Sequence, residues 1–300
     1  MLQARYHNCS SSQKNVQKSF FQLDLVMEKG AFIHFYDGPQ EAMEPISSNV
    51  IFVFDVALTG EKLMIAKNAF GSLMEALNPK DQFSVVFFNG KFGKEPSSDW
   101  PNFTASPENI QVATDYVLAL DNEVSNISSF YLTEAIGHAQ QLALSNNVIN
   151  RIVLLTDGGR GQDNTMIPHI DLPIAAVGIE ANIEFLHQVA NKAYDLVENL
   201  IEDVPVGDQL KAVKRHLSDV LLKDLHLRYL GQEGELNLTT SNHFPFLSRE
   251  AGVVVAGLLS KHQEIKTVEV IANNSLGDYS DSLRYVPGEE DLGCNAQVIS

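Results

Sequence analysis

The sequence predicts an α/β fold, a doubly wound and mostly parallel sheet with helices on both faces. Two apolar runs carry this prediction, because strands buried on both faces of a parallel sheet are apolar almost throughout. They are residues 50–54 (VIFVF) and 151–156 (RIVLLT), and an acidic residue with a nearby glycine turn follows each of them. Helical patterns alternate with strand patterns from about residue 50 to about residue 220.

Turn and capping residues mark the borders of the elements in this region. Asn78-Pro79 ends the first helical pattern, and Ser106-Pro107 begins the second, because serine caps helix N-termini and proline suits the first helical position. The expected strands are 50–54, 82–88, 151–156 and 174–178, and the expected helices are 63–77, one from 106, 132–144, 183–193 and 207–221.

The two flanks have a different texture, with short alternating strands separated by Gly, Asn and Pro. We expect them to pair in a small β-sandwich into which the α/β domain is inserted. The expected flanking strands are 20–27, 31–36, 225–229, 252–258 and 267–272. The expected parts are an N-terminal flank over 1–45, the α/β domain over 46–222, a C-terminal flank over 223–275 and an irregular tail over 276–300.

Composition excludes several classes of function. The chain has 300 residues, is 44% hydrophobic and carries a formal net charge of −17. Without a block of Lys and Arg, such an acidic chain is poorly suited to nucleic acid, and basic partners are favoured over sulfated polysaccharides. The longest apolar stretch lies near 253–259, far short of the roughly 20 residues of a membrane-spanning helix. We therefore expect neither nucleic-acid binding nor a membrane span.

Evidence on the cellular compartment is mixed. The first 15 residues contain no apolar segment of the kind found in a signal peptide. Cys9 and Cys294 lie at opposite ends of the chain and are as compatible with free thiols as with one disulfide. Five Asn-x-Ser/Thr sequons, however, favour glycosylation in a secretory compartment. Their asparagines are Asn8, Asn102, Asn126, Asn237 and Asn273.

Three polar loops are expected at one edge of the sheet. In an open parallel sheet, ligands bind outside the carboxyl ends of the strands, where the strand order reverses. The loops are 55–59 (DVALT), 125–128 (SNIS) and 157–159 (DGG). Two carboxylates with neighbouring hydroxyls form an environment of hard oxygens, which suits Mg²⁺ or Ca²⁺. Each acidic residue alone is also compatible with an ordinary turn or cap.

Several segments together resemble a known family. NVIFVFDVALTGEKLMIAKNAFGSLMEALNPKDQFSVVFFNG, WPNFTASPENIQVATDYVLAL, SNI and RIVLLTDGG are similar to the von Willebrand factor type A domain of inter-α-trypsin inhibitor heavy chains. AFIHFYDG, VLLKDLHLRY and REAGVVVAGLL resemble the segments that flank this domain there, so the likeness covers roughly residues 30 to 270. The resemblance implies a Rossmann-like α/β domain.

The resemblance also implies the residues of a metal-ion-dependent adhesion site. By this comparison Asp55, Thr59, Ser125 and Asp157 stand where the family has metal ligands. Ala57 stands where the family has a serine, so one direct oxygen ligand is missing. Because a Mg²⁺ or Ca²⁺ site needs several oxygens in a fixed geometry, we expect a degenerate site with weakened or lost metal binding.

The function implied by the resemblance is that of a secreted, non-enzymatic adhesion module. Heavy chains of this family bind protein and glycosaminoglycan partners of the extracellular matrix and take part in hyaluronan metabolism. The segment Asp-Pro-His-Phe, through which they become esterified to chondroitin sulfate or hyaluronan, does not occur in this chain. We therefore expect binding to matrix or serum-type proteins and no covalent transfer to hyaluronan.

Two alternatives start from the same residues. IFVFDVALTG also resembles the first motif of haloacid-dehalogenase phosphatases, in which Asp55 would be the nucleophile. Ala57 replaces the general acid of that motif, so the leaving group would have no proton donor. The other alternative is a purely structural matrix component that mediates assembly without metal. A serine hydrolase is not indicated, since no Gly-x-Ser-x-Gly motif occurs.

Overall fold

The computed structural model divides into two compact units. One unit, here the α/β unit, comprises Pro45–Val220 and Ser248–Ala251, and the other, the flanking unit, comprises Met1–Glu44, Leu221–Leu247 and Gly252–Ser300. The residues that the structure describes are 31–39, 42–88, 102–120, 129–144, 148–158, 169–190, 196–231, 234–236, 238–259 and 264–284.

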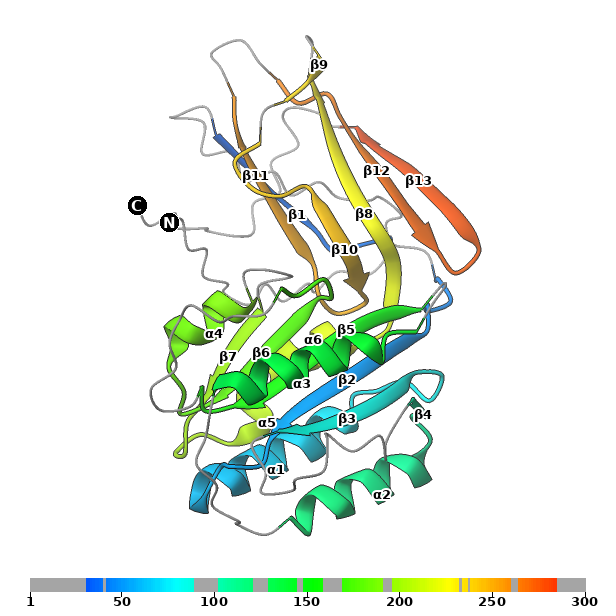
Figure 1. Ribbon diagram of the computed structural model, residues 1–300. Helices are drawn as coiled ribbons and strands as arrows, with labels where there is room; N and C mark the ends of the chain where they lie inside the picture. Colours follow the sequence, from blue (N-terminus) through cyan, green and yellow to red (C-terminus); the bar gives the residue numbers. More distant parts are fainter. Residues whose placement is uncertain are drawn as a thin grey trace. The chain divides into compact units, whose positions relative to one another are not determined.

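A six-stranded sheet forms the centre of the α/β unit (Figure 1). Its strand order is β4-β3-β2-β5-β6-β7, in which β4 is antiparallel to β3 and all other neighbours are parallel. The strands are β2 (Ser48–Asp55), β3 (Gln82–Phe88), β4 (Phe103–Thr104), β5 (Ile149–Thr156), β6 (Ile174–Ile179) and β7 (Leu196–Leu200). The doubly wound, mostly parallel sheet predicted from the sequence is confirmed.

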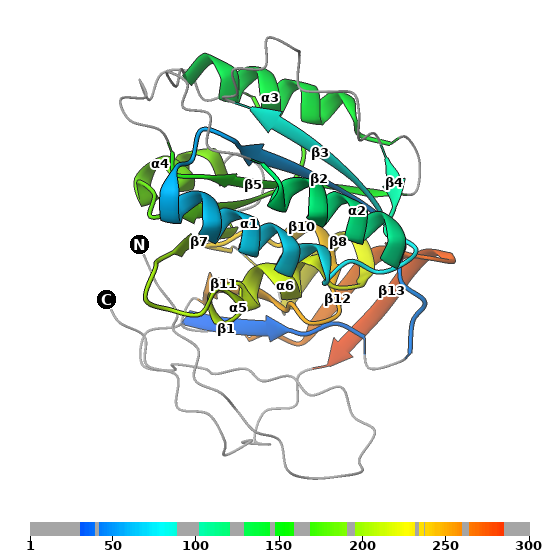
Figure 2. The ribbon, with the colours of Figure 1, turned by 90° about the horizontal axis from the view of Figure 1, so that it is seen from below.

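Helices cover both faces of this sheet (Figure 2). Residues of α1, α2 and α6 share one hydrophobic core with the sheet, and residues of α3 and α4 share the other. The helices are α1 (Gly60–Met74), α2 (Pro107–Leu118), α3 (Ser129–Gln141), α4 (Ile183–Ala190), α5 (Val206–Gln209) and α6 (Lys211–Leu217).

The apolar run of β2 shows why both faces are needed. Successive side chains of a strand point to opposite faces, so Phe52 and Phe54 lie in one core while Ile51 and Val53 lie in the other. All four side chains are fully buried. A strand with two apolar faces must be covered on both sides, and here the helices of the two layers cover β2.

A cluster of buried polar side chains lies at the edge of the sheet where the parallel strands begin. Arg151 of β5 donates hydrogen bonds from Nη1 to the carbonyl oxygen of His216 at 2.5 Å and from Nη2 to that of Leu217 at 3.4 Å. Asp81, just before β3, accepts hydrogen bonds from the backbone N–H of Ser48 at 2.8 Å and of Asn78 at 3.0 Å. Burial raises the pKa of Asp81, and the nearby Arg151 opposes that shift.

The flanking unit consists of two antiparallel sheets that share one hydrophobic core. β1 (Ala31–Tyr36) pairs with β11 (Val253–Leu258), and a second sheet has the order β10-β8-β12-β13 with β9 beside β8. The strands of the second sheet are β8 (Val220–Gly231), β9 (Gly234–Glu235), β10 (His243–Ser248), β12 (Thr267–Asn274) and β13 (Gly277–Arg284).

A buried aromatic pair links the two sheets of this unit. His34 of β1 and Tyr229 of β8 are almost fully buried, and Nδ1 of the histidine lies 2.7 Å from the tyrosine hydroxyl. Phe32 packs beside the same tyrosine with ring centroids 5.0 Å apart. Burial lowers the pKa of His34 to about 4, so the imidazole is neutral at pH 7.

Two expectations about elements are corrected. The helix expected over 207–221 ends earlier, because α5 and α6 are separate helices and the chain is already extended at Val220, which starts β8. Residues 277–284, expected in an irregular tail, form β13, which pairs along its whole length with β12. The strand expected at 20–27 lies outside the described residues.

Candidate functional site

Asp55 and Asp157 lie at the carboxyl edge of the sheet, on two neighbouring strands. After β2 the chain passes through α1 to β3 on one side, and it later returns to form β5 on the other side of β2. The strand order therefore reverses between β2 and β5, the position where ligands bind in open α/β sheets. Asp55 is the last residue of β2, and Asp157 directly follows β5.

Both carboxylate oxygens of Asp55 accept hydrogen bonds inside the protein. Oδ1 accepts from the backbone N–H of Ala57 at 3.0 Å, and Oδ2 accepts from the hydroxyl of Thr156 at 2.8 Å. Asp55 is 1% exposed. A buried carboxylate needs such donors because burial without hydrogen bonds is costly.

Thr156 also shapes the loop that follows β5. Its hydroxyl oxygen accepts a hydrogen bond of 3.1 Å from the backbone N–H of Gly158, whose φ of +78° strongly favours glycine. A Cβ at this glycine would also lie 3.2 Å from a ring carbon of Phe185. Thr156 thus connects the loop that carries Asp157 to the carboxylate of Asp55.

Lys62 pairs with the second acid of the site. It lies in the first turn of α1, and its Nζ donates to Oδ2 of Asp157 at 3.2 Å. The two side chains are 32% and 19% exposed, so the pair is partly shielded from water. A positive charge therefore lies beside the carboxylate that the family resemblance assigns to a metal.

The other residues of the first loop offer little to a metal. The methyl side chain of Ala57 is buried at 7% exposure. Thr59 is exposed and occupies the N-cap position of α1, with extended φ and ψ of −125° and 156°, but its side chain does not cap the helix. Gly60 then starts the helix with a φ of +55°.

Part of the predicted site lies outside the described residues. This holds for Ser125, for the sequon asparagines Asn8, Asn126 and Asn237, and for the two cysteines Cys9 and Cys294. Among the described residues, Asn102 precedes β4 and Asn273 lies in β12. Asp55, the last residue of β2, and Asp157, which directly follows β5, lie at the ends of adjacent strands. The assignment of Asp55, Thr59, Ser125 and Asp157 as metal ligands stays a prediction.

Further acidic side chains lie near the start of α1. Glu61 and Glu202 share a side-chain hydrogen bond, and repulsion from Glu61 raises the pKa of Glu202. Asp203 and Glu180 add smaller repulsions to the same group. Glu61, which neighbours Lys62 in sequence, therefore interacts with the loop after β7.

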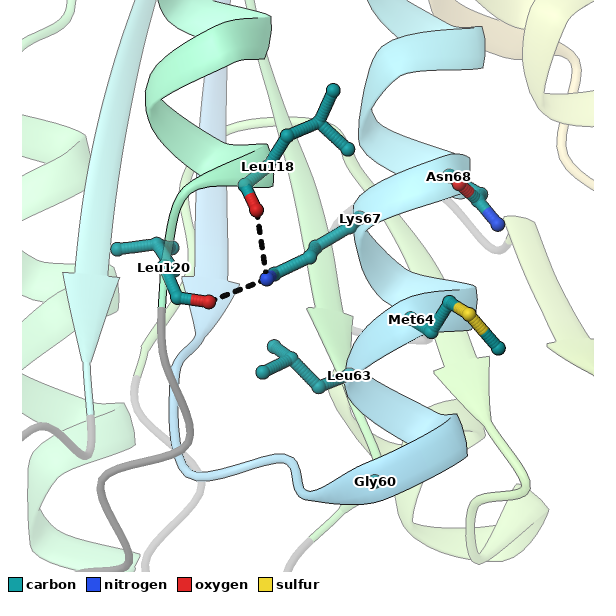
Figure 3. A pocket seen from close by; sticks show the side chains of 7 residues that line it. All are labelled: Gly60, Leu63, Met64, Lys67, Asn68, Leu118 and Leu120. Carbon is teal, nitrogen blue, oxygen red and sulfur yellow. Dashed lines mark hydrogen bonds between the residues drawn. The ribbon is translucent and has the colours of Figure 1, made fainter.

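A shallow groove of about 360 Å³ lies between α1 and the end of α2 (Figure 3). Lys67 donates hydrogen bonds from Nζ to the carbonyl oxygen of Leu118 at 3.0 Å and to that of Leu120, at the C-terminal end of α2. The lining residues are Gly60, Leu63, Met64, Lys67, Asn68, Leu118 and Leu120. The groove has both polar and apolar lining residues, and Lys62 is not among them.

The residues of the candidate site meet the needs of a divalent metal poorly. Mg²⁺ and Ca²⁺ require six or more oxygen ligands in total, some of them water. Here Asp55 accepts hydrogen bonds from two internal donors, Asp157 has an ammonium group as a neighbour, and the side chain of Ala57 has no oxygen. Among the described residues, no three His, Cys, Asp or Glu side chains form a metal-ligand group. These contacts fit two separate acids, one held by hydrogen bonds and the other by an ion pair, better than a metal site.

Sequence reasoning missed Thr156 and Lys62 as members of the site. The sequence contains a signal for Thr156, which is the polar last residue of the apolar strand β5. The neighbouring strand β2 also ends in a polar residue, Asp55. The parallel register pairs Phe54 with Leu155, which places the next residues, Asp55 and Thr156, side by side. Lys62 carried no comparable signal, because its reach to Asp157 depends on where α1 starts.

Structural comparison identifies the fold. A von Willebrand factor type A protein from Catenulispora acidiphila superposes with a TM-score of 0.51 and 14% identity, over 85% of this chain and 67% of that chain. The chain has a von Willebrand factor type A fold. Since the identity is low, this likeness is evidence for the fold alone.

Sequence comparison finds relatives among the inter-α-trypsin inhibitor heavy chains. The chain is 25% identical over 258 residues to heavy chain H2 of Sus scrofa, covering 78% of this chain and 26% of that protein. It is also 25% identical over 260 residues to heavy chain H1 of Bos taurus, covering 80% and 28%. No protein-family model matches. The chain thus spans about a quarter of the length of these relatives.

The resemblance stated from the sequence is confirmed by both comparisons. The relatives are inter-α-trypsin inhibitor heavy chains, and the fold is that of a von Willebrand factor type A domain with antiparallel sheets in the flanking unit. Within the part of the chain that the structure describes, no helix has the length and apolarity to cross a membrane.

Proposed function

We propose that the chain is a non-enzymatic protein-interaction module of the inter-α-trypsin inhibitor heavy chain type, whose adhesion site works without a divalent metal. The observation that carries this proposal is the state of Asp55, whose two carboxylate oxygens accept hydrogen bonds from Ala57 and Thr156. Similarity to heavy chains over about four fifths of the chain supports the interaction role.

The loss of the metal rests on the chemistry of the first loop. A methyl group at Ala57 removes one oxygen ligand, and the exposed Thr59 is the remaining hydroxyl of that loop. Because oxygen sites for Mg²⁺ and Ca²⁺ gain affinity from ligand number and charge, each missing ligand weakens binding. The proposal therefore assigns adhesion to the protein surface at this edge of the sheet.

A phosphatase reaction at Asp55 is not supported by the geometry. A carboxylate nucleophile must reach the phosphorus atom, but Asp55 is 1% exposed and both of its oxygens accept hydrogen bonds. The general acid that would protonate the leaving group is replaced by Ala57. The proposal therefore assigns no catalytic role to Asp55.

The proposed setting is extracellular, with protein partners of the matrix or serum. Five sequons and the similarity to heavy chains support secretion. The net charge of −17 favours partners with basic surfaces.

Thermal melts with and without metal test the proposal. A ligand that binds only the folded state raises the melting temperature by an amount that grows with its concentration. We expect no shift with Mg²⁺, Ca²⁺ or Mn²⁺ up to millimolar concentration relative to EDTA. A concentration-dependent rise that disappears in Asp55→Asn and Asp157→Asn would refute the metal-free site.

Two further assays separate the remaining alternatives. Hydrolysis of an aryl phosphate that is lost in Asp55→Asn would show an enzyme, and we expect none above background. Biolayer interferometry against a panel of purified matrix and serum proteins, run in EDTA and in Mg²⁺, tests the interaction role. We expect binding of equal affinity in both buffers, and binding only in Mg²⁺ would contradict the proposal.

A further inference from the structure

The contact between Lys62 and Asp157 joins two elements at the site. Lys62 comes from the first turn of α1 after β2, and Asp157 comes from the loop after β5. Their Nζ and Oδ2 atoms are 3.2 Å apart. The lysine thus connects the segment after β2 with the segment after β5. Its positive charge lies beside Asp157, where a bound cation would also neutralise the negative charge of this edge of the sheet.

An ammonium group and a divalent metal cannot both sit against this carboxylate without a large cost. Mg²⁺ and Ca²⁺ bind oxygens at about 2.0 to 2.6 Å, so a metal on Asp157 would lie within a few ångströms of Lys62. Two positive charges at that distance repel strongly, because shielding by water is incomplete in a partly buried site. Metal binding would therefore require Lys62 to leave its position.

The lysine also lowers the negative charge that would attract a metal. Asp55 and Asp157 together carry two negative charges when ionised, and Lys62 cancels one of them. A hard divalent cation binds mainly through charge and oxygen donors, so the pair weakens the site independently of Ala57. The distance and the shielding of the pair make this a defined contact of the folded state.

We propose that Lys62 is a resident cation that takes the place of a divalent metal beside Asp157 and excludes metal from the adhesion site. This inference deepens the proposed function, since it rests on a metal-free site and names the group that keeps it so. It predicts that restoring the missing hydroxyl at Ala57 is insufficient to recover metal binding. Removal of the lysine charge is also required.

The test measures Mg²⁺ and Mn²⁺ affinity by isothermal titration calorimetry for four proteins. They are the wild type, Ala57→Ser, Lys62→Gln and the double variant Ala57→Ser/Lys62→Gln. We expect the double variant to bind metal at least about tenfold more tightly than Ala57→Ser, since one charge at this range is worth more than that factor. Circular dichroism checks that each protein is folded. We expect the Lys62 variants to fold, because this side chain is partly exposed.

Matched controls separate the local charge from the net charge. Lys211→Gln in the Ala57→Ser background removes another lysine from an ion pair, the 2.9 Å contact with Asp208, and we expect no gain in metal affinity. Lys62→Arg in the same background keeps the charge and is expected to stay as weak as Ala57→Ser. A gain with Lys211→Gln equal to that with Lys62→Gln would overturn the inference.

The outcomes distinguish this inference from the proposed function. If Ala57→Ser binds metal as tightly as the double variant, Lys62 does not exclude metal, while the loss of metal through Ala57 still holds. If the wild type binds metal at millimolar concentration, the metal-free function fails. In that case a further tenfold gain in Lys62→Gln over wild type would still support the role of the lysine.

Discussion

The hydroxyl of Thr156 donates a hydrogen bond of 2.8 Å to Oδ2 of Asp55, and both residues are 1% exposed. The bond joins the ends of β2 and β5, which are neighbours in the parallel sheet. Because the same hydroxyl oxygen accepts from the N–H of Gly158, one side chain fixes both loops of the candidate site. The geometry of this edge therefore depends on Thr156 as much as on the two acids.

Thr156→Val tests this dependence. Valine keeps the shape of threonine but leaves Asp55 without one donor and the N–H of Gly158 without its acceptor. Leaving buried polar groups unsatisfied costs about 1 to 3 kcal/mol, so we expect a loss of that size in the free energy of unfolding by urea. Thr156→Ser keeps the hydroxyl and is expected to lose clearly less. Equal losses in both variants would show that the methyl group, not the hydrogen bonds, is responsible.

Two buried histidines predict that the protein loses stability in mild acid. Burial lowers the pKa of His216 to about 3, with a smaller contribution from Arg151, and that of His34 to about 4. In the unfolded chain a histidine has a pKa of about 6.5. The unfolded state therefore binds more protons between these values. The stability is fully present above about pH 6.5 and falls by up to about 1.4 kcal/mol per pH unit and histidine below it.

His216→Gln and His34→Gln assign this acid sensitivity to the two units. Each variant should flatten the fall in unfolding free energy between pH 6.5 and 4.5, measured by urea titration at several pH values. Asp81 acts with the opposite sign. Because its pKa is raised in the folded state, the folded protein binds a proton at a higher pH than the unfolded chain does, and this stabilises the fold as the pH falls. An exposed histidine, His169, provides the control His169→Gln, and a flattening of equal size there would contradict the burial argument.

The sequence predicted the parts of the fold that depend on short patterns. The apolar runs of β2 and β5 are buried on both faces as expected, and the predicted cap is present, since the N–H of Asn109 donates to Oγ of Ser106 at 3.3 Å. The position of Asp55 and Asp157 at one edge followed from the parallel topology. These features need only local residues and a general rule of sheet architecture.

Features that depend on distant partners were not predictable. The helix expected over 207–221 rested on the helical spacing of Leu210, Val213, Leu217 and Val220. The chain is nevertheless extended at Val220, where the carbonyl oxygen accepts a hydrogen bond from the N–H of Ile46. β13 shows few apolar residues, and its pairing with β12 defines it. The ion pair of Lys62 likewise depends on the distance between the start of α1 and the loop after β5, which are far apart in the sequence.

The hydrogen bonds of Lys67 to the C-terminal end of α2 are expected to stabilise this helix. Its Nζ donates to the carbonyl oxygens of Leu118 and Leu120, and a positive charge at a helix C-terminus is favourable. Lys67→Met should cost about 1 kcal/mol in the free energy of unfolding and speed amide hydrogen exchange near Ala119. Lys67→Arg keeps the charge and donors and should restore most of the protection. Unchanged exchange in Lys67→Met would refute a capping role.

Asn102 begins one of the sequons that the structure describes, and its hydrogen bonds allow a test of glycosylation. Its Oδ1 accepts from the hydroxyl of Ser84 at 3.1 Å, and its backbone N–H donates to the same Oγ at 2.8 Å. These bonds do not use Nδ2, the atom to which an N-linked glycan attaches. After expression through the secretory pathway of mammalian cells, we expect Asn102→Gln to lose the mass of one glycan.

Thr104→Ala separates the glycan from the hydrogen bonds of Asn102. It removes the same sequon while leaving Asn102 and Ser84 intact, so we expect the same loss of mass by intact-protein mass spectrometry. Asn102→Gln should also reduce stability by about 1 kcal/mol, because the longer glutamine side chain cannot place its oxygen where Oδ1 accepts from the hydroxyl of Ser84. If neither variant changes the mass, Asn102 carries no glycan, and the argument for secretion loses the support of this sequon.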